Sequence, residues 1–273
     1  MNRVIDLSEH NGVIDFEKVK KSGIDTVILR VGWIGNKENH TIDKKFEEYY
    51  KQARLYDFKI GYYVYSYCLT TKNVENGARW LEKKLYNKQI DLPVFIDMED
   101  QSLYQCSNIE LTNQVVAFCK YFKNLGIKSG VYASKFWFTS KFDWSKIQDF
   151  YIWLAEWNKK TNYTFKKKVD IWQYSDIGKV DGIKTNVDMN ISYIKENEKK
   201  KDEDFEMVKS YKNGSTIEIV YADSSCSMVV GQLNKYEICE CIGVKNGRYI
   251  VRYKIDGTNN FKVGFVKYNG GIN

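Results

Sequence analysis

Two acidic residues with the spacing of a catalytic pair follow an apolar run near the middle of the chain. Residues 92–100 read Leu-Pro-Val-Phe-Ile-Asp-Met-Glu-Asp, so the apolar run leads directly into Asp97 and Glu99. Residues two apart on a strand point the same way, which puts Asp97 and Glu99 on one face and Met98 and Asp100 on the other. Two carboxyls at the end of a buried strand are costly unless they are paired or do chemistry. The pair therefore indicates acid–base chemistry; the alternative is a strand end in solvent whose acids cap the next helix.

Other predicted strands also end in polar or aromatic residues, which is where active sites collect in parallel α/β proteins. These residues are Asp6, Glu9, Arg30, Tyr132, Glu156, Gln173 and Asp188. Each has a structural alternative, and Arg30 could simply pair with a buried acid. The chain has only two histidines, His10 and His40, and no C-x-x-C cluster. Carboxylates are therefore the predicted catalysts, and we expect no metal and no cofactor.

Strand-like and helix-like segments alternate along the first two thirds of the chain. The predicted strands cover residues 4–8, 26–33, 59–68, 92–100, 129–134, 150–156, 169–175 and 186–190. The predicted helices cover residues 16–22, 42–56, 73–85 and 110–125. Eight strands with crossover helices early on predict an α/β protein with a (β/α)8-like barrel that is incomplete in its second half.

The pattern changes after residue 195. Residues 196–205 form a run of mixed charges, which is typical of a linker. Residues 206–273 contain short β runs at 215–221, 236–242, 248–253 and 261–266, separated by Asn-Gly and Asp-Gly turns. We therefore predict a domain at 1–195, a linker at 196–205, and a small all-β barrel at 206–273 that acts as a binding module.

Composition limits the classes of function. The chain has 273 residues, 43% of them hydrophobic and 28% charged, with a formal net charge of +7. No apolar run is long enough to span a membrane, and no basic stripe or nucleic-acid motif is present. The amino terminus lacks the features of a secretion signal, so we expect synthesis in the cytoplasm with the six cysteines as free thiols.

An ordered set of motifs in residues 1–195 resembles the glycoside hydrolase family 25 lysozymes, the N-acetylmuramidases. The motifs are residues 5–12, 61–63, 95–99, 130–132, 153–155, 172–174 and 187–190. The carboxyl-terminal region looks like a bacterial SH3-type wall-binding domain, a match that rests on size, β pattern and position. The combination resembles a phage or prophage endolysin, which would act on the wall after a membrane protein has permeabilised the membrane.

This resemblance implies roles for four acids. Glu99 matches the general acid that protonates the leaving oxygen, and Asp97 matches the carboxylate that assists on the other side of the sugar. Asp6 and Asp188 match the acids around them. Spacing does not separate retention from inversion; we favour retention through the substrate's own N-acetyl group, oriented by Asp97.

Aromatic and polar residues around these acids are predicted to bind the sugars. Tyr63, Tyr132, Trp153 and Trp172 are candidates for sugar stacking, with core packing as an equal alternative. Arg30 and Gln173 are candidates for polar contacts. The family often has a polar residue where this chain has Val64, so contacts there can differ.

The predicted partner is peptidoglycan, cut at the β-1,4 bond between N-acetylmuramic acid and N-acetylglucosamine, with a further wall ligand for the small domain. The alternatives are a bacterial autolysin or bacteriocin-like muramidase, and a catalytically silent wall-binding protein. A start or cleavage near Met207 would release a small domain able to associate with the full chain, although an ordinary methionine also explains this residue.

Overall fold

The computed structural model describes residues 2–157, 162–195, 210–223, 225–245, 248–258, 261–267 and 271–272. The chain divides into two compact units, Met1–Ile194 and Lys195–Asn273. The predicted linker at 196–205, Met207 and the Asn-Gly turn at 246–247 lie outside the described residues.

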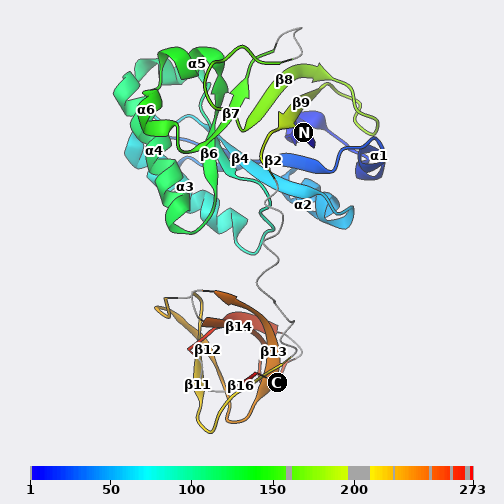
Figure 1. The fold of residues 1–273 in the computed structure, drawn as a ribbon, viewed down its shortest axis with the longest axis vertical. Coiled ribbons are helices and arrows are strands. Elements are labelled where there is room, and N and C mark those ends of the chain that lie inside the picture. The colour runs from blue at the N-terminus through cyan, green and yellow to red at the C-terminus, as the bar shows by residue number, and fades with distance from the viewer. Residues whose placement is uncertain are drawn as a thin grey trace. The chain divides into compact units, whose positions relative to one another are not determined.

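The first unit is built on a closed ring of eight strands (Figure 1). Around the ring the order is β1-β9-β8-β7-β6-β5-β4-β2, and pairing of β1 with β2 closes it. The strands are β1 (Asn2–Leu7), β2 (Thr26–Ile34), β4 (Lys59–Ser66), β5 (Val94–Asp97), β6 (Ser129–Ser134), β7 (Tyr151–Ala155), β8 (Ile171–Gly178) and β9 (Val187–Ser192). A two-residue strand, β3 (Thr41–Ile42), adds to the end of β2. The prediction of an α/β protein with an eight-stranded barrel is confirmed.

Helices cover the outside of the ring along its first six strands (Figure 1). They are α1 (Phe16–Lys21), α2 (Phe46–Leu55), α3 (Thr71–Leu85), α4 (Asn108–Asn124), α5 (Lys135–Ser140) and α6 (Trp144–Ile147), with 3-10 turns η1 (Glu9–Asn11), η2 (Asn36–Glu38) and η3 (Gln101–Gln105). The longest, α4, is capped at its amino end by Ser107, whose hydroxyl accepts a hydrogen bond from the Glu110 backbone N–H. Among the described helices, none combines the length and apolar character needed to cross a membrane.

The last strand of the ring runs against its neighbours. Strands β1, β2 and β4 to β8 pair in parallel, whereas β9 pairs antiparallel with both β8 and β1. Only residues 179–186 connect β8 to β9, and they form no helix, so the chain turns back as a hairpin. The ring of strands is therefore complete, and what the second half lacks is helices.

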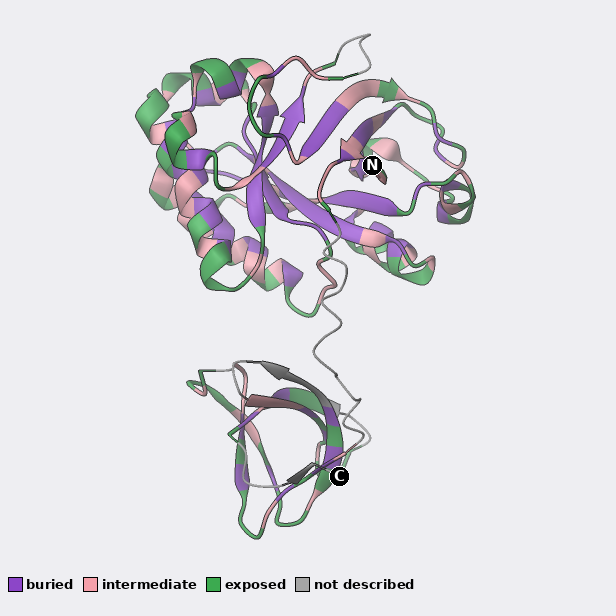
Figure 2. Ribbon diagram, viewed as in Figure 1, coloured by how far each residue is buried: buried purple, intermediate pink, exposed green. Residues whose placement is uncertain are grey.

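Strict alternation along the strands separates two apolar layers. Along β5, Phe95 packs inside the ring while Ile96 packs outside it against the helices. The inner layer contains Val4, Ile28, Tyr63, Leu92, Phe95, Tyr132, Trp153, Ala155 and Ile171. Figure 2 shows the strands as the most buried part of this unit.

A glycine allows β6 and β7 to approach each other closely. Gly130 on β6 faces Tyr151 of β7 so closely that a Cβ there would lie 2.0 Å from the Tyr151 carbonyl oxygen. Strands β6 and β7 can therefore pair this closely only if position 130 has no side chain.

The second unit is all-β in its described residues. Its seven-stranded sheet has the order β12-β11-β15-β14-β13-β10-β16, with every pair antiparallel. The strands are β10 (Tyr211–Lys212), β11 (Glu218–Tyr221), β12 (Val229–Leu233), β13 (Ile238–Lys245), β14 (Arg248–Lys254), β15 (Phe261–Val266) and β16 (Gly271–Ile272). Its core contains Tyr211, Val220, Leu233, Cys239, Cys241, Val251, Tyr253 and Val266.

The packing at Gly130 can be tested by substitution. We expect Gly130→Ala to lower the free energy of unfolding by about 1–3 kcal/mol, because the new methyl group must push β6 and β7 apart. Thermal melting of the full chain measures this, with Lys123→Ala on the exposed side of α4 as the control. Equal melting temperatures for the two variants would contradict the role of Gly130.

Candidate active site

A cleft opens where the parallel strands of the ring end, and four carboxyls converge on it. Asp6 comes from β1, Asp97 from β5, Glu99 from the connection after β5, and Asp188 from β9. The cleft is lined by Asp6, Ser8, His10, Asn11, Arg30, Tyr63, Tyr65, Asp97, Glu99, Tyr132, Trp153, Gln173, Asn186 and Asp188. The structure therefore brings the four predicted acids together, although they lie up to 182 residues apart, between Asp6 and Asp188.

Asp6 and Asp188 form a cross-strand pair. They are directly opposite each other in the antiparallel ladder of β1 and β9, and their carboxyls are hydrogen-bonded. Burial, the charge of Asp6 and this hydrogen bond raise the pKa of Asp188 to about 8. Near neutral pH Asp188 therefore holds the proton that joins the two carboxyls.

The position of Asp188 differs from the predicted one in its strand. We expected it near the end of a strand like the other acids, but it is the second residue of β9. Because β9 is antiparallel, its amino end lies at the rim where the parallel strands have their carboxyl ends. The reversal of β9 is what brings Asp188 to the cleft.

Two buried amides hold the carboxyl of Asp6. Its Oδ2 accepts hydrogen bonds from Asn190 Nδ2 at 2.8 Å and from Gln173 Nε2 at 3.1 Å. Asn190 Oδ1 in turn accepts from Trp153 Nε1 at 2.8 Å, and Gln173 Oε1 accepts from the Tyr132 hydroxyl at 2.9 Å. Burial raises the pKa of Asp6, while these amide hydrogen bonds oppose the rise. Asp6 is therefore fixed in position by donors on β8 and β9, which Tyr132 of β6 and Trp153 of β7 orient in turn.

The predicted alternation after β5 holds in the structure even though the strand ends at Asp97. Asp97 lines the cleft, Met98 packs in the outer apolar layer, and Glu99 lines the cleft again. Asp100 caps η3 by accepting from the Ser102 backbone N–H at 2.8 Å. The capping alternative thus applies to Asp100, not to the two acids in the cleft.

Asp97 and Glu99 differ in their surroundings. Asp97 is 4% exposed, and its Oδ1 has no hydrogen-bond partner among the described residues. Burial and the neighbouring Glu99 raise the pKa of Asp97 well above its usual range. Glu99 is open to solvent at the mouth of the cleft but is enclosed on its other sides. This partial loss of water, together with the neighbouring carboxyls of Asp188 and Asp100, raises the pKa of Glu99 to about 7, and the nearby Tyr132 hydroxyl opposes the rise.

Arg30 faces the cleft but is held by other acids. Its Nε donates to Asp43 Oδ2 at 2.7 Å, and its Nη2 lies 3.5 Å from Glu9 Oε1. Asp43 is 2% exposed and was not recognised in the sequence, because no motif marks it. The structural alternative for Arg30, pairing with a buried acid, is thus present in the structure. Asp43 and Glu9 largely neutralise the charge of Arg30, so Arg30 gives the four acids of the cleft little compensating charge.

Three of the predicted aromatic residues form the floor of the cleft. Tyr63 and Tyr132 meet the ring of Trp153 edge-on, with ring centroids 5.7 and 4.7 Å apart. All three line the cleft, but Trp153 is only 1% exposed. Trp153 therefore supports the floor as a core residue, and the two tyrosines line the cleft beside it.

The structure does not bring Trp172 to the cleft, contrary to the prediction. Trp172 is 2% exposed and packs in the outer layer against Tyr163 and Tyr174. Its neighbour Gln173 points inward, and adjacent residues of a strand face opposite sides. Trp172 and Gln173 are adjacent on β8, so only one of them can line the cleft.

Several residues at the site were not singled out from the sequence. Asn190 was noted only within a motif, and Trp157 was not noted at all. Trp157 is 54% exposed and donates from Nε1 to Gln173 Oε1 at 2.9 Å. The one signal in the sequence for Trp157 is its place two residues after the end of a buried strand.

A further groove, lined by Glu9, His10, Arg30, Trp33, Tyr65 and Tyr67, shares His10, Arg30 and Tyr65 with the cleft.

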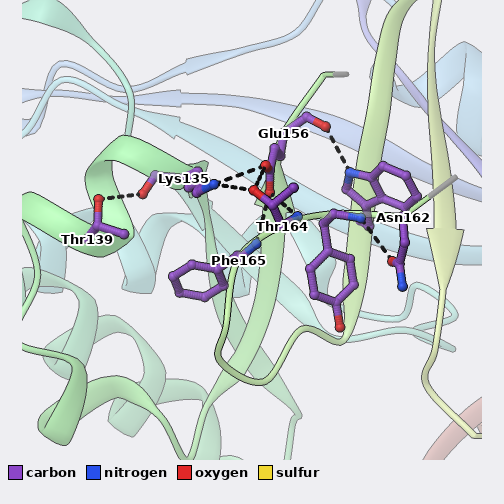
Figure 3. A network of polar contacts seen from close by, with 8 residues as sticks. Lys135, Thr139, Glu156, Asn162, Thr164 and Phe165 are labelled. Atoms are coloured by element: carbon purple, nitrogen blue, oxygen red, sulfur yellow. Dashed lines mark hydrogen bonds and ion pairs between the residues drawn. The ribbon is translucent and has the colours of Figure 1, made fainter. Parts of the chain in front are cut away.

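Glu156, noted at the end of a predicted strand, stays outside the cleft in a polar network (Figure 3). Its Oε1 lies 3.1 Å from Lys135 Nζ, and its Oε2 accepts from the Thr164 backbone N–H at 2.9 Å. Burial opposes ionisation of Glu156, but the hydrogen bonds from Thr164 outweigh it and the pKa is lowered. Glu156 is therefore an ionised structural anchor.

Metal ligation is not a feature of the described residues. No three His, Cys, Asp or Glu side chains in the described parts of the chain are arranged to hold a metal ion. The chemistry that the arrangement itself can perform is proton transfer and charge stabilisation by carboxyls, as in hydrolysis of a glycosidic bond.

An α/β barrel that gathers acids of differing pKa at the carboxyl ends of its strands has the make-up of a glycoside hydrolase. Comparison with known families bears on this directly. The model of the glycosyl hydrolases family 25 matches residues 5–183, well over half of the chain, and the chain belongs to this family.

Individual proteins that are similar to this chain are consistent with the family assignment. The chain is 27% identical over 194 residues to an autolytic lysozyme of Clostridium acetobutylicum, covering 68% of this chain and 54% of the relative. The modular autolysin LytC from Streptococcus pneumoniae has a similar fold, with a TM-score of 0.62 and 23% identity over 70% of this chain and 46% of LytC. The spore cortex lytic enzyme SleM of Clostridium perfringens matches 97% of both chains, with a TM-score of 0.61 and 15% identity. This chain thus spans about half the length of the first two relatives.

The raised pKa of Asp188 predicts a pH-dependent stability. In the folded chain Asp188 stays protonated up to about pH 8, whereas in the unfolded chain it ionises near its ordinary pKa of 3.8. The wild type therefore loses stability relative to a neutral residue as pH rises from about 4 to 8. Asp188→Asn, whose amide can still donate to Asp6, should melt at least about 2 °C higher than wild type at pH 8 and nearly equally at pH 4.

Thermal melts across this pH range measure the difference. The control is Asp149→Asn, because Asp149 is exposed. A gain for Asp188→Asn that stays constant with pH would contradict the shared proton.

Proposed function

We propose that the chain is a muramidase that hydrolyses the β-1,4 bond between N-acetylmuramic acid and N-acetylglucosamine in peptidoglycan. The observation that carries this proposal is the convergence of Asp6, Asp97, Glu99 and Asp188 in one cleft of a family 25 barrel. The lysozyme and autolysin named among its relatives support the same substrate.

The proposed catalytic role of each acid follows from its surroundings. Glu99, with a pKa of about 7, holds a proton near neutral pH and lies open to solvent at the mouth, so it serves as the general acid for the leaving oxygen. The Asp6–Asp188 pair and Asp97 supply negative charge for an oxocarbenium-like transition state.

Asp97 has a buried oxygen available for the substrate. Its Oδ1, without a partner among the described residues, can accept a hydrogen bond from the N–H of a substrate N-acetyl group. Such a bond favours the ionised form of Asp97 and so offsets the effect of burial. It would also orient the acetamido oxygen for attack on the sugar carbon, which gives retention without a protein nucleophile.

The small unit is proposed as a wall-binding module of the SH3 type. A row of apolar side chains crosses the outside of its sheet through three cross-strand pairs, Val229–Tyr221, Tyr221–Phe265 and Phe265–Ile250. Lys267 lies over the Tyr221 ring, 5.1 Å from its centroid. Aromatic rings beside a cation suit a polymer of sugars and carboxylates. Binding through this unit would raise the local concentration of substrate for the barrel.

For the biological role we propose a phage or prophage endolysin that reaches the wall once the membrane has been permeabilised. The same chemistry would serve a bacterial autolysin. Gene context distinguishes them: neighbouring genes for phage structural and membrane-pore proteins support the endolysin, whereas chromosomal wall-synthesis genes support the autolysin.

The bond assignment is tested by digesting purified Gram-positive walls, reducing the products with borohydride and reading them by mass spectrometry. We expect reduced muramic acid at the new ends. Reduced glucosamine would overturn the bond assignment, and intact binding without new ends would leave only a silent wall-binding protein.

The role of Glu99 predicts a large loss of rate. Glu99→Gln should lower the rate of wall hydrolysis by about 100-fold or more, because the amide cannot donate a proton to the leaving oxygen. The control is Glu48→Gln, at an exposed acid on α2. Lysis at the wild-type rate by Glu99→Gln would refute the assigned role.

The pH profile should follow the proton on Glu99. Activity requires the protonated form, so kcat/KM of the wild type should fall as pH rises through about 7. Asp100→Asn keeps a side chain that can cap η3 but removes a neighbouring charge that raises the pKa of Glu99, so the alkaline limb of its profile should move to lower pH. An unmoved alkaline limb would argue that another group controls it.

Cosedimentation with purified walls tests the small unit. In a Glu99→Gln background, which leaves the walls intact, Tyr221→Ala should reduce the bound fraction several-fold because it interrupts the apolar row. Tyr236→Ala, at an exposed tyrosine in a turn of the same unit, is the matched control. Equal binding by both variants would count against this face.

A further inference from the structure

Trp157 is the most exposed tryptophan at the rim of the cleft, and the proposed chemistry does not use it. Its side chain is 54% exposed, directly after Glu156 and two residues beyond the end of β7. Large aromatic side chains are usually buried where packing alone decides their position. A flat apolar face exposed beside an acidic cleft is suited to stack on a sugar ring.

The indole is held in place by the cleft itself. Its Nε1 donates to Gln173 Oε1 at 2.9 Å, and the amide of the same Gln173 donates to Asp6. The ring is thus linked through one buried side chain to a cleft acid. An aromatic ring that is fixed before binding loses little side-chain entropy when a ligand stacks on it.

The backbone beside Trp157 is also anchored. The Glu156 carbonyl accepts from Trp172 Nε1 at 3.0 Å, and the Glu156 carboxylate accepts from the backbone N–H groups of Thr164 and Phe165 at 2.9 and 3.2 Å (Figure 3). Lys135 Nζ completes the network at 3.1 Å. These contacts explain why Trp172, although outside the cleft, matters for its rim.

A second aromatic surface lies on the opposite side of the ring. The groove that contains Trp33, Tyr65 and Tyr67 lies beside the cleft at the ends of β2 and β4. In the closed order of eight strands, β7 and β2 are four strands apart in either direction. Trp157 and Trp33 therefore stand at opposite points of the rim, and the acids from β1, β9 and β5 lie between them.

We propose that Trp157 forms a sugar-stacking subsite, so that a glycan strand crosses the mouth of the barrel from the Trp33 groove, over the acids, to the indole of Trp157. This inference rests on the proposed glycan hydrolysis and adds the path of the substrate. It makes Trp157 a residue that selects for longer glycan strands over single disaccharide units.

Kinetics on glycan fragments of defined length test the subsite. Wild type and variants are compared on peptide-free glycan fragments of two disaccharides and of four, with new reducing ends as the readout. For Trp157→Ala we expect a roughly tenfold rise in KM on the longer fragment, from the loss of one aromatic contact, with kcat little changed. On the shorter fragment the KM should change less. Equal effects on both fragments would overturn the subsite.

Two further variants separate stacking from positioning. Trp157→Phe keeps a flat ring but cannot donate to Gln173, so it should retain most of the wild-type KM if the ring stacks on a sugar. Equal losses of kcat in the Phe and Ala variants on both fragments would assign Trp157 only to the orientation of Gln173. Tyr86→Ala is the matched control, because Tyr86 is 76% exposed and follows α3, before the amino end of β5 at the other end of the ring.

Binding distinguishes failure of the subsite from failure of the proposed function. Calorimetric titration of Glu99→Gln with the longer fragment should show about tenfold weaker binding when Trp157→Ala is added. Unchanged affinity would overturn the subsite even if hydrolysis is established. A wild type that binds the fragment but releases no reducing ends would overturn the proposed reaction, while the binding comparison would still decide the role of Trp157.

Discussion

The site depends on the way the barrel closes. Because β9 runs antiparallel between β8 and β1, Asp188 lies directly opposite Asp6, and two carboxyls lie side by side in the cleft. They can do so by sharing a proton, which raises the pKa of Asp188, and by accepting the amide hydrogen bonds of Asn190 and Gln173 at Asp6. The closure of the sheet and the electrostatics of the cleft are thus one constraint.

The scarcity of positively charged side chains at the cleft favours the protonated forms of Asp97 and Glu99. Arg30 is the one permanently charged cation among the described residues that line the cleft, and Asp43 and Glu9 already pair with it. The carboxyls in the cleft therefore lack compensating charge, and protons take that place. A site that holds protons near neutral pH is suited to donate one, as proposed for Glu99. The buried Arg30–Asp43 pair contributes to this because it withholds the charge of Arg30 from the cleft acids.

The aromatic side chains at the floor and at the rim of the cleft are both held by hydrogen bonds to buried amides. Trp153 packs under Tyr63 and Tyr132 and donates to Asn190, so the apolar core of the barrel also orients an amide that holds Asp6. Trp157 at the rim is tied to Gln173 in a comparable way. The core side of this arrangement holds the catalytic geometry, as a preorganised site requires, and Trp157 takes its own orientation from Gln173.

The sequence by itself determined the α/β barrel, the all-β character of the second unit, and the inward placement of Asp97 and Glu99 around Met98. These follow from periods of two and of 3.6 residues, which are local properties of a chain. The tertiary structure alone decided the direction of β9, the outward face of Trp172, the pairing of Arg30 with Asp43, and the place of Trp157 beside Gln173. Each of these depends on which strands become neighbours, because a side chain's partner across a sheet is set by strand order and register, and the local pattern does not specify either.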